Sequence, residues 1–102
     1  MQAANISSSY KINLFIAGQT AKSELAIANI QRIFAGLNIP LELDIIDVLE
    51  EPELAEQFRI LATPTLLKVS PLPVRRIIGD LSDERKLFSG LGIVVLNKKQ
   101  EE

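Results

Sequence analysis

The chain of 102 residues contains no cysteine and no histidine. Without cysteine it has no disulfide, no thiolate nucleophile and no cysteine-ligated zinc. Without histidine it has no imidazole base, no histidine-containing catalytic triad and no imidazole-bound metal. These absences exclude thiol redox chemistry and most hydrolase mechanisms, so we expect a protein that is not an enzyme and that has no cofactor.

Long apolar runs and an excess of positive charge are also missing. No run approaches the roughly 18 residues that are needed to cross a bilayer. The amino-terminal segment, residues 1–9, lacks the basic start and apolar stretch of a signal peptide. The net charge of −2 gives no electrostatic footprint for nucleic acid. We therefore expect a cytoplasmic protein that binds neither membranes nor nucleic acid.

The composition present is that of one folded domain spanning residues 1–102, with residues 1–9 and 97–102 flexible. Its charge is unevenly distributed. Basic residues predominate from Arg59 onward, whereas every charged residue between positions 42 and 56 is acidic: Glu42, Asp44, Asp47, Glu50, Glu51, Glu53 and Glu56. Both a solvated acidic face and a binding surface explain this pattern.

The first half of the chain predicts a strand, a helix and a second strand. Residues 10–17 alternate so that apolar side chains occupy both faces, which indicates a strand buried on both sides. A helix capped by Thr20 follows, with Gly36 as its carboxyl-terminal stop. Its apolar stripe consists of Ile27, Ile30, Phe34 and Leu37. Residues 41–48 then read as the second strand.

The second half predicts a short helix, two strands and a last helix. Pro52 suits the first turn of the short helix, and Leu54, Phe58 and Leu61 are expected to face inward. Strands at residues 65–69 and 74–79 are joined by turn residues, and Ser82 is expected to cap the last helix. The resulting order, β-α-β-α-β-β-α, is that of the thioredoxin fold.

In that fold the proline that begins the third strand is usually cis, and Pro64 occupies its place. The loop that carries the redox cysteines corresponds here to residues 17–23, AGQTAKS, which contain none. Two explanations for Pro64 stay open. It sets the geometry of a turn, or it flanks a glutathione-type site in which Thr20 or Ser23 supplies a hydroxyl beside a helix amino terminus.

A resemblance to a known family rests on three segments: LFIAGQT, IDVLEEPELAEQFRILATPTLLKV and VRRIIGDLSDERKLFSGL. With these segments the chain resembles the KaiB family of cyanobacterial circadian clock proteins over residues 10–96. This resemblance implies binding to the hexameric KaiC ATPase, sequestration of KaiA and competition with a histidine kinase whose fold is similar to that of KaiB. It also implies two alternative folds. One is a homotetrameric ground state with the order β-α-β-β-α-α-β, and the other is the thioredoxin-like monomer.

The carboxyl-terminal segment, residues 87–96, gives a physical reason for such a switch. Leu87, Leu91, Val94 and Val95 form a helical stripe, but Gly90 and Gly92 each cost a helix about 1 kcal/mol. The IVVL run favours a strand. A slightly weak terminal helix explains the same residues. With the resemblance, the residues expected to determine the fold are Pro64, Pro71, Pro73, Gly90 and Gly92.

Several departures from the family pattern predict a divergent paralogue. The chain has no long acidic tail, Leu72 interrupts a proline run, and Gly92 replaces an acidic residue. The resemblance places partner contacts at Glu42, Asp44, Asp47 and Arg59. Asp47 also suits the capping of a turn, and Arg59 suits a helix carboxyl terminus. The alternative function is a redox-inactive thioredoxin-like adaptor for another signalling partner.

Overall fold

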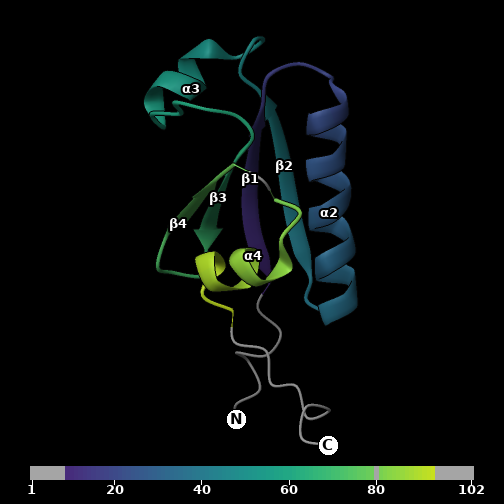
Figure 1. The fold of residues 1–102 in the computed structure, drawn as a ribbon. Helices are drawn as coiled ribbons and strands as arrows, with labels where there is room; N and C mark the ends of the chain where they lie inside the picture. Colours follow the sequence, from purple (N-terminus) through teal and green to yellow (C-terminus); the bar gives the residue numbers. More distant parts are fainter. Residues whose placement is uncertain (1–8, 80, 94–102) are drawn as a thin grey trace, which may run out of the picture.

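A computed structural model describes residues 9–79 and 81–93 of the chain. These residues form a four-stranded sheet and three helices (Figure 1). The elements in chain order are β1 (Tyr10–Ile16), α2 (Ala21–Leu37), β2 (Leu41–Asp47), α3 (Pro52–Gln57), β3 (Thr65–Ser70), β4 (Arg75–Ile78) and α4 (Glu84–Leu91). The predicted thioredoxin-like order is confirmed. None of the helices in this part of the chain is long and apolar enough to cross a bilayer.

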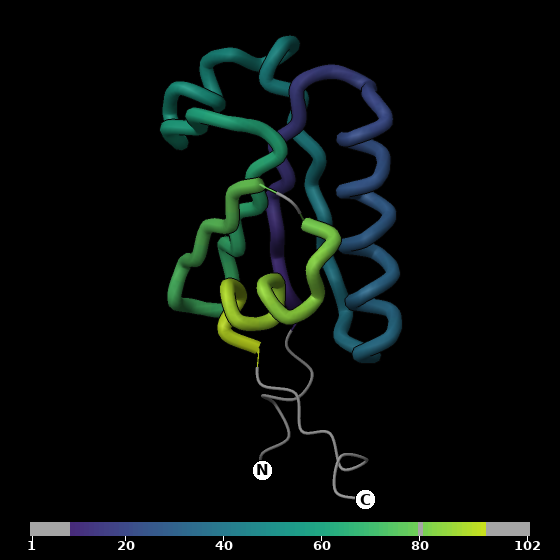
Figure 2. Tube along the Cα trace, in the orientation of Figure 1, coloured from purple at the N-terminus to yellow at the C-terminus, as the bar shows by residue number. Residues whose placement is uncertain are grey.

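The sheet has the strand order β2-β1-β3-β4. β1 pairs with β2 in parallel, from Tyr10 opposite Leu41 to Ile16 opposite Asp47. β3 is antiparallel to both β1 and β4, so β3 and β4 form the predicted hairpin. Figure 2 shows how the green and yellow half of the chain, from β3 to α4, lies beside the purple and blue β1-α2-β2 half. β2 and β4 are therefore the edge strands.

The alternation of β1 supplies a core on each face of the sheet. Ile12, Leu14 and Ile16 pack with α2 and α4 on one face. Phe15 lies on the opposite face with Ile46 and Leu67, where Leu54 and Phe58 of the α3 segment cover it. The prediction that this strand is buried on both sides is confirmed, since Ile12 to Ile16 are all buried.

Two predicted helix boundaries are wrong by one or two residues. α2 runs past Gly36 and ends at Leu37, because Asn38 adopts the left-handed conformation (φ 61°) that closes the helix. At the start of α4, the N-cap is Asp83 and not Ser82. The Asp83 carboxylate accepts from the amides of Arg85 and Lys86 at 3.0 and 3.3 Å, which satisfies two unpaired helix donors.

The inward orientation predicted for Leu61 is also wrong, since this side chain is 91% exposed. α3 ends at Gln57, and Arg59 has a positive φ of 54°. This turn breaks the helical spacing that would have placed Leu61 on the stripe of Leu54 and Phe58.

The last helix is shorter than its sequence stripe. Leu87 and Leu91 are buried, but the helix ends at Leu91 and Gly92 caps it with φ 77°. Gly92 thus lies outside the helix, so the predicted helical cost does not apply there. Gly90 lies inside it, where a Cβ would come within 2.7 Å of the Ile77 side chain. Val94 and Val95 lie outside the described residues.

Candidate interaction surface

The place of a redox pair, between β1 and α2, is filled by a helix cap. Thr20 and Ser23 form a capping box: Thr20 Oγ1 accepts from the Ser23 amide at 3.1 Å, and Ser23 Oγ accepts from the Thr20 amide at 2.9 Å. Ser23 Oγ also lies 3.0 Å from the Gly18 carbonyl, to which it donates. Both hydroxyls are thus engaged in shaping the helix start, which weakens the glutathione-type interpretation.

The cavity beside these hydroxyls is small. It has a volume of about 30 Å³ and is bordered by Thr63 and Pro64, whose peptide bond is cis. The Ser70–Pro71 and Leu72–Pro73 bonds are cis as well. A space of this size does not enclose a tripeptide such as glutathione.

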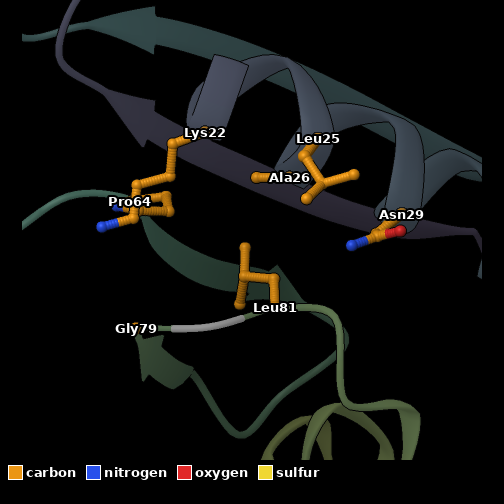
Figure 3. A pocket seen from close by; sticks show the side chains of 7 residues that line it. All are labelled: Lys22, Leu25, Ala26, Asn29, Pro64, Gly79 and Leu81. Carbon is orange, nitrogen blue, oxygen red and sulfur yellow. The ribbon is translucent and has the colours of Figure 1, made fainter. Parts of the chain in front are cut away.

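A larger cavity, of about 290 Å³, lies between α2 and the turn after β4. Figure 3 shows side chains of α2 facing Pro64 and Leu81 across it. Its lining consists of Lys22, Leu25, Ala26, Asn29, Pro64, Gly79 and Leu81. This lining includes no nucleophile paired with a base, which covalent catalysis requires. The arrangement suits contact with an apolar group.

Glu42 and Asp44 lie on β2, at the edge of the sheet, and both are exposed. On a strand, residues two apart point to the same face. Glu42, Asp44 and Ile46 therefore share a face, which is the one on which the α3 segment packs. Figure 1 shows α3 beyond the carboxyl ends of β1 and β2, away from the middle of this face. The structure therefore brings these two carboxylates together on an accessible strand, as a contact surface requires.

Asp47, at the end of β2, has a structural task. Its Oδ1 atom accepts from the amides of Gly18 and Leu49, each at 3.0 Å. Its carbonyl accepts from Glu50 and Glu51, which closes the turn before α3. The turn-capping interpretation of Asp47 is therefore supported by geometry, and it fixes the loop that follows β1 to the end of β2.

Arg59 follows α3 and is exposed. It borders a shallow groove of about 590 Å³ together with Ala55, Glu56, Ile60 and Leu61. Arg76 of β4 donates to the carbonyls of Phe58 and Arg59 at 2.8 and 3.1 Å. The cation that caps the end of α3 is thus Arg76 and not Arg59.

Two polar residues that the sequence analysis passed over are buried. Asn13 of β1 is only 9% exposed, and its Oδ1 atom has no hydrogen-bond partner among the described residues. Lys68 of β3 is 3% exposed and donates from Nζ to the Leu91 carbonyl at 3.0 Å. Each is a polar residue inside an apolar strand, which is the signal that would have identified it. The described residues contain no cluster of acidic side chains arranged for a metal ion.

Comparison with known protein families matches residues 13–93 to the KaiB domain. The chain belongs to the KaiB family. The circadian clock oscillator protein KaiB of Synechococcus elongatus is 49% identical over 89 residues, covering 83% of this chain and 84% of that protein. The protein of the same name from Rippkaea orientalis is 42% identical over 102 residues, covering 96% and 95%.

Solved structures show to which proteins the fold of this chain is similar. The N-terminal domain of Synechococcus elongatus SasA is similar with a TM-score of 0.69 and 27% identity, covering 83% of this chain and 85% of that domain. Mitochondrial thioredoxin 3 from Saccharomyces cerevisiae has a TM-score of 0.64 at 18% identity, covering 87% and 83%. At that identity the thioredoxin supports the fold alone. The arrangement of this KaiB-family chain is therefore thioredoxin-like.

Proposed function

We propose that this chain is a regulatory protein of the KaiB type, which binds a KaiC-type hexameric ATPase and catalyses no reaction. The observation that carries the proposal is the accessible edge of β2 with Glu42 and Asp44, in a family member whose redox position is occupied by a helix cap. The names of its relatives as circadian clock oscillator proteins support a clock role.

The contact surface in this proposal extends from β2 to the end of α3. Glu42 and Asp44 supply charge, Arg59 supplies a cation beside the groove, and Asp47 holds the connecting turn in place. Acidic residues on such a face select for basic partners and against acidic ones, because like charges oppose association. We therefore expect a partner surface that carries complementary positive charge.

Exchange with a second fold belongs to the same proposal. The residues proposed to be involved are Pro64, Pro71 and Pro73 and those of α4, where Gly90 packs against Ile77 and Gly92 ends the helix. The thioredoxin-like form is proposed to be the monomer that binds the ATPase. Two packings within a few kcal/mol of each other are the condition for such exchange.

Native mass spectrometry with a KaiC homologue from the same genome tests the proposed function. We expect a complex with the wild-type chain and a loss of binding when both carboxylates of β2 are reversed, in Glu42→Lys/Asp44→Lys. Glu24→Lys is the control, since Glu24 is an exposed acidic residue in the first turn of α2. A chain that stays monomeric and ignores every KaiC homologue would instead be the redox-inactive adaptor.

A further inference from the structure

The cavity between α2 and the turn after β4 has an apolar middle and two polar ends. Its α2 lining follows the spacing i, i+3, i+4 and i+7 of one helix face and consists of Lys22, Leu25, Ala26 and Asn29. Leu25 is a large apolar residue that is nevertheless 57% exposed, and Leu81 faces it across the cavity (Figure 3). An apolar group placed between the two leucines would remove Leu25 from water, which is favourable.

Asn29 presents a hydrogen-bond donor at one end of this cavity. The residue is only 9% exposed. Its Oδ1 atom accepts from Arg32 at 3.4 Å, and Glu84 of α4 holds Arg32 by an ion pair of 3.3 Å. Because an amide accepts through its oxygen and donates through its nitrogen, the contact with Arg32 determines which way the nitrogen faces. Figure 3 shows this nitrogen turned toward the cavity, where it has no hydrogen-bond partner among the described residues.

The opposite end of the cavity carries a positive charge. The Lys22 side chain extends from the first turn of α2 to Pro64 (Figure 3). It forms no ion pair with any residue that the structure describes. Asn29 lies two helical turns further along, at about 10 Å for a rise of 1.5 Å per residue. Both ends therefore offer donors, and the described lining between them contains no acidic side chain.

We propose that this cavity binds a small carboxylate with an apolar body and a carbonyl group at its far end. The carboxylate bonds the Lys22 ammonium, the apolar body lies between Leu25 and Leu81, and the carbonyl oxygen accepts from Asn29 Nδ2. The volume of about 290 Å³ matches a molecule of about ten non-hydrogen atoms, since a water molecule takes roughly 30 Å³. Mostly apolar cavities with a few placed polar groups are typical of small-molecule sites. This inference goes beyond the proposed function, and none of these residues lies on β2.

The probe for this proposal is 6-oxoheptanoate, titrated into the full chain labelled with ¹⁵N. Two matched compounds each lack one polar end: heptanoate has no ketone, and 2-heptanone has no carboxylate. We expect 6-oxoheptanoate to shift the side-chain amide signals of Asn29 and the backbone signals of Leu25 and Leu81. Each matched compound should bind about ten-fold more weakly, as expected for the loss of one hydrogen bond or ion pair. Equal affinities of the three compounds, or no shift at Asn29, contradict the proposal.

Variants test the two ends separately. Asn29→Asp keeps an oxygen for Arg32 but replaces the donor by an acceptor, so 6-oxoheptanoate should lose its advantage over heptanoate. Lys22→Met keeps an apolar stem and removes the charge. Both carboxylates should then bind about ten-fold more weakly, while the affinity for 2-heptanone stays the same. Lys86→Met is the control, since Lys86 is an exposed lysine of α4 outside the lining.

The Lys22 variant keeps the proposal testable even where Asn29→Asp does not fold. Lys22 is exposed, and misfolding would weaken the binding of 2-heptanone as well. A selective loss of carboxylate binding therefore supports the site. Carboxylate binding that is unchanged in Lys22→Met, or reduced equally in Lys86→Met, overturns the proposal.

The remaining outcomes concern another occupant and the proposed function. If light scattering shows a dimer of the free chain that Leu25→Lys dissociates, a second copy covers the cavity, and the small-molecule site is contradicted. A chain that binds a KaiC homologue but shows no shift at Asn29 keeps its proposed function and loses this inference. A chain that binds 6-oxoheptanoate at Asn29 and ignores every KaiC homologue has the opposite result.

Discussion

Lys68 is a cation buried on the sheet face that carries α4. Its Nζ atom bonds the Leu91 carbonyl at the end of that helix and lies 5.5 Å from the centre of the Tyr10 ring. Burial lowers the pKa of Lys68, and the charge of Arg75, its register partner on β4, lowers it further. The helix terminus and the ring partly compensate an ammonium group that has lost its water.

This lowered pKa predicts how stability depends on pH. The unfolded chain binds the Lys68 proton up to its ordinary pKa of 10.5, whereas the folded chain releases it at lower pH. Between those two values the unfolded state holds more protons, so the free energy of unfolding rises with pH. We expect wild type to gain stability over Lys68→Met as pH increases toward 10.5, measured by urea unfolding at several pH values. A difference that is flat or falls with pH contradicts this.

At the scale of the element, two glycines at helix ends have opposite roles. Gly36 lies inside α2 near its end, and a Cβ there would meet no atom within 4 Å. Gly92 caps α4 with φ 77°, a conformation that costs a residue with a side chain roughly 1–2 kcal/mol. The same substitution should therefore act in opposite directions at the two positions.

We expect Gly36→Ala to raise the free energy of unfolding by up to about 1 kcal/mol, because alanine is the better helix former. Gly92→Ala should lower it by about 1 kcal/mol, because of the left-handed backbone. Urea midpoints of the two variants and wild type measure both effects. Changes of the same sign would show that the end of α4 is not the one described.

The sequence predicts the helices and strands well, because the spacing of apolar residues along each element reflects which of its faces are buried. Apolar residues on both faces of β1 predicted a strand buried on both sides, and the apolar stripe of α2 predicted a helix; both predictions are confirmed. Element ends were harder to predict, since Asn38 and Arg59 adopt positive φ values that neither residue type requires. Asn13 and Lys68 each stand inside an apolar strand, which indicates burial, but their partners on β2 and α4 are distant in sequence and could not be predicted from local patterns. Glu42 and Asp44 of β2 were singled out by the family resemblance, and both are exposed.

At the scale of the whole molecule, the two free edges of the sheet carry opposite charge. β2 presents Glu42 and Asp44, and β4 presents Arg75 and Arg76. Symmetric pairing of either edge with its copy would place like charges opposite each other, which is destabilising. The acidic edge is therefore suited to a basic partner of another kind.

The central claim is that this chain acts by binding a partner at the β2 edge. Hydrogen–deuterium exchange of the chain, measured with and without a KaiC homologue, tests this claim most directly. We predict slower exchange on complex formation in Leu41–Asp47 and in the α3 segment, with little change at the amino terminus of α2. If amide exchange slowed only around the small cavity lined by Thr20, Ser23 and Thr63, and stayed the same in β2, the account would be contradicted.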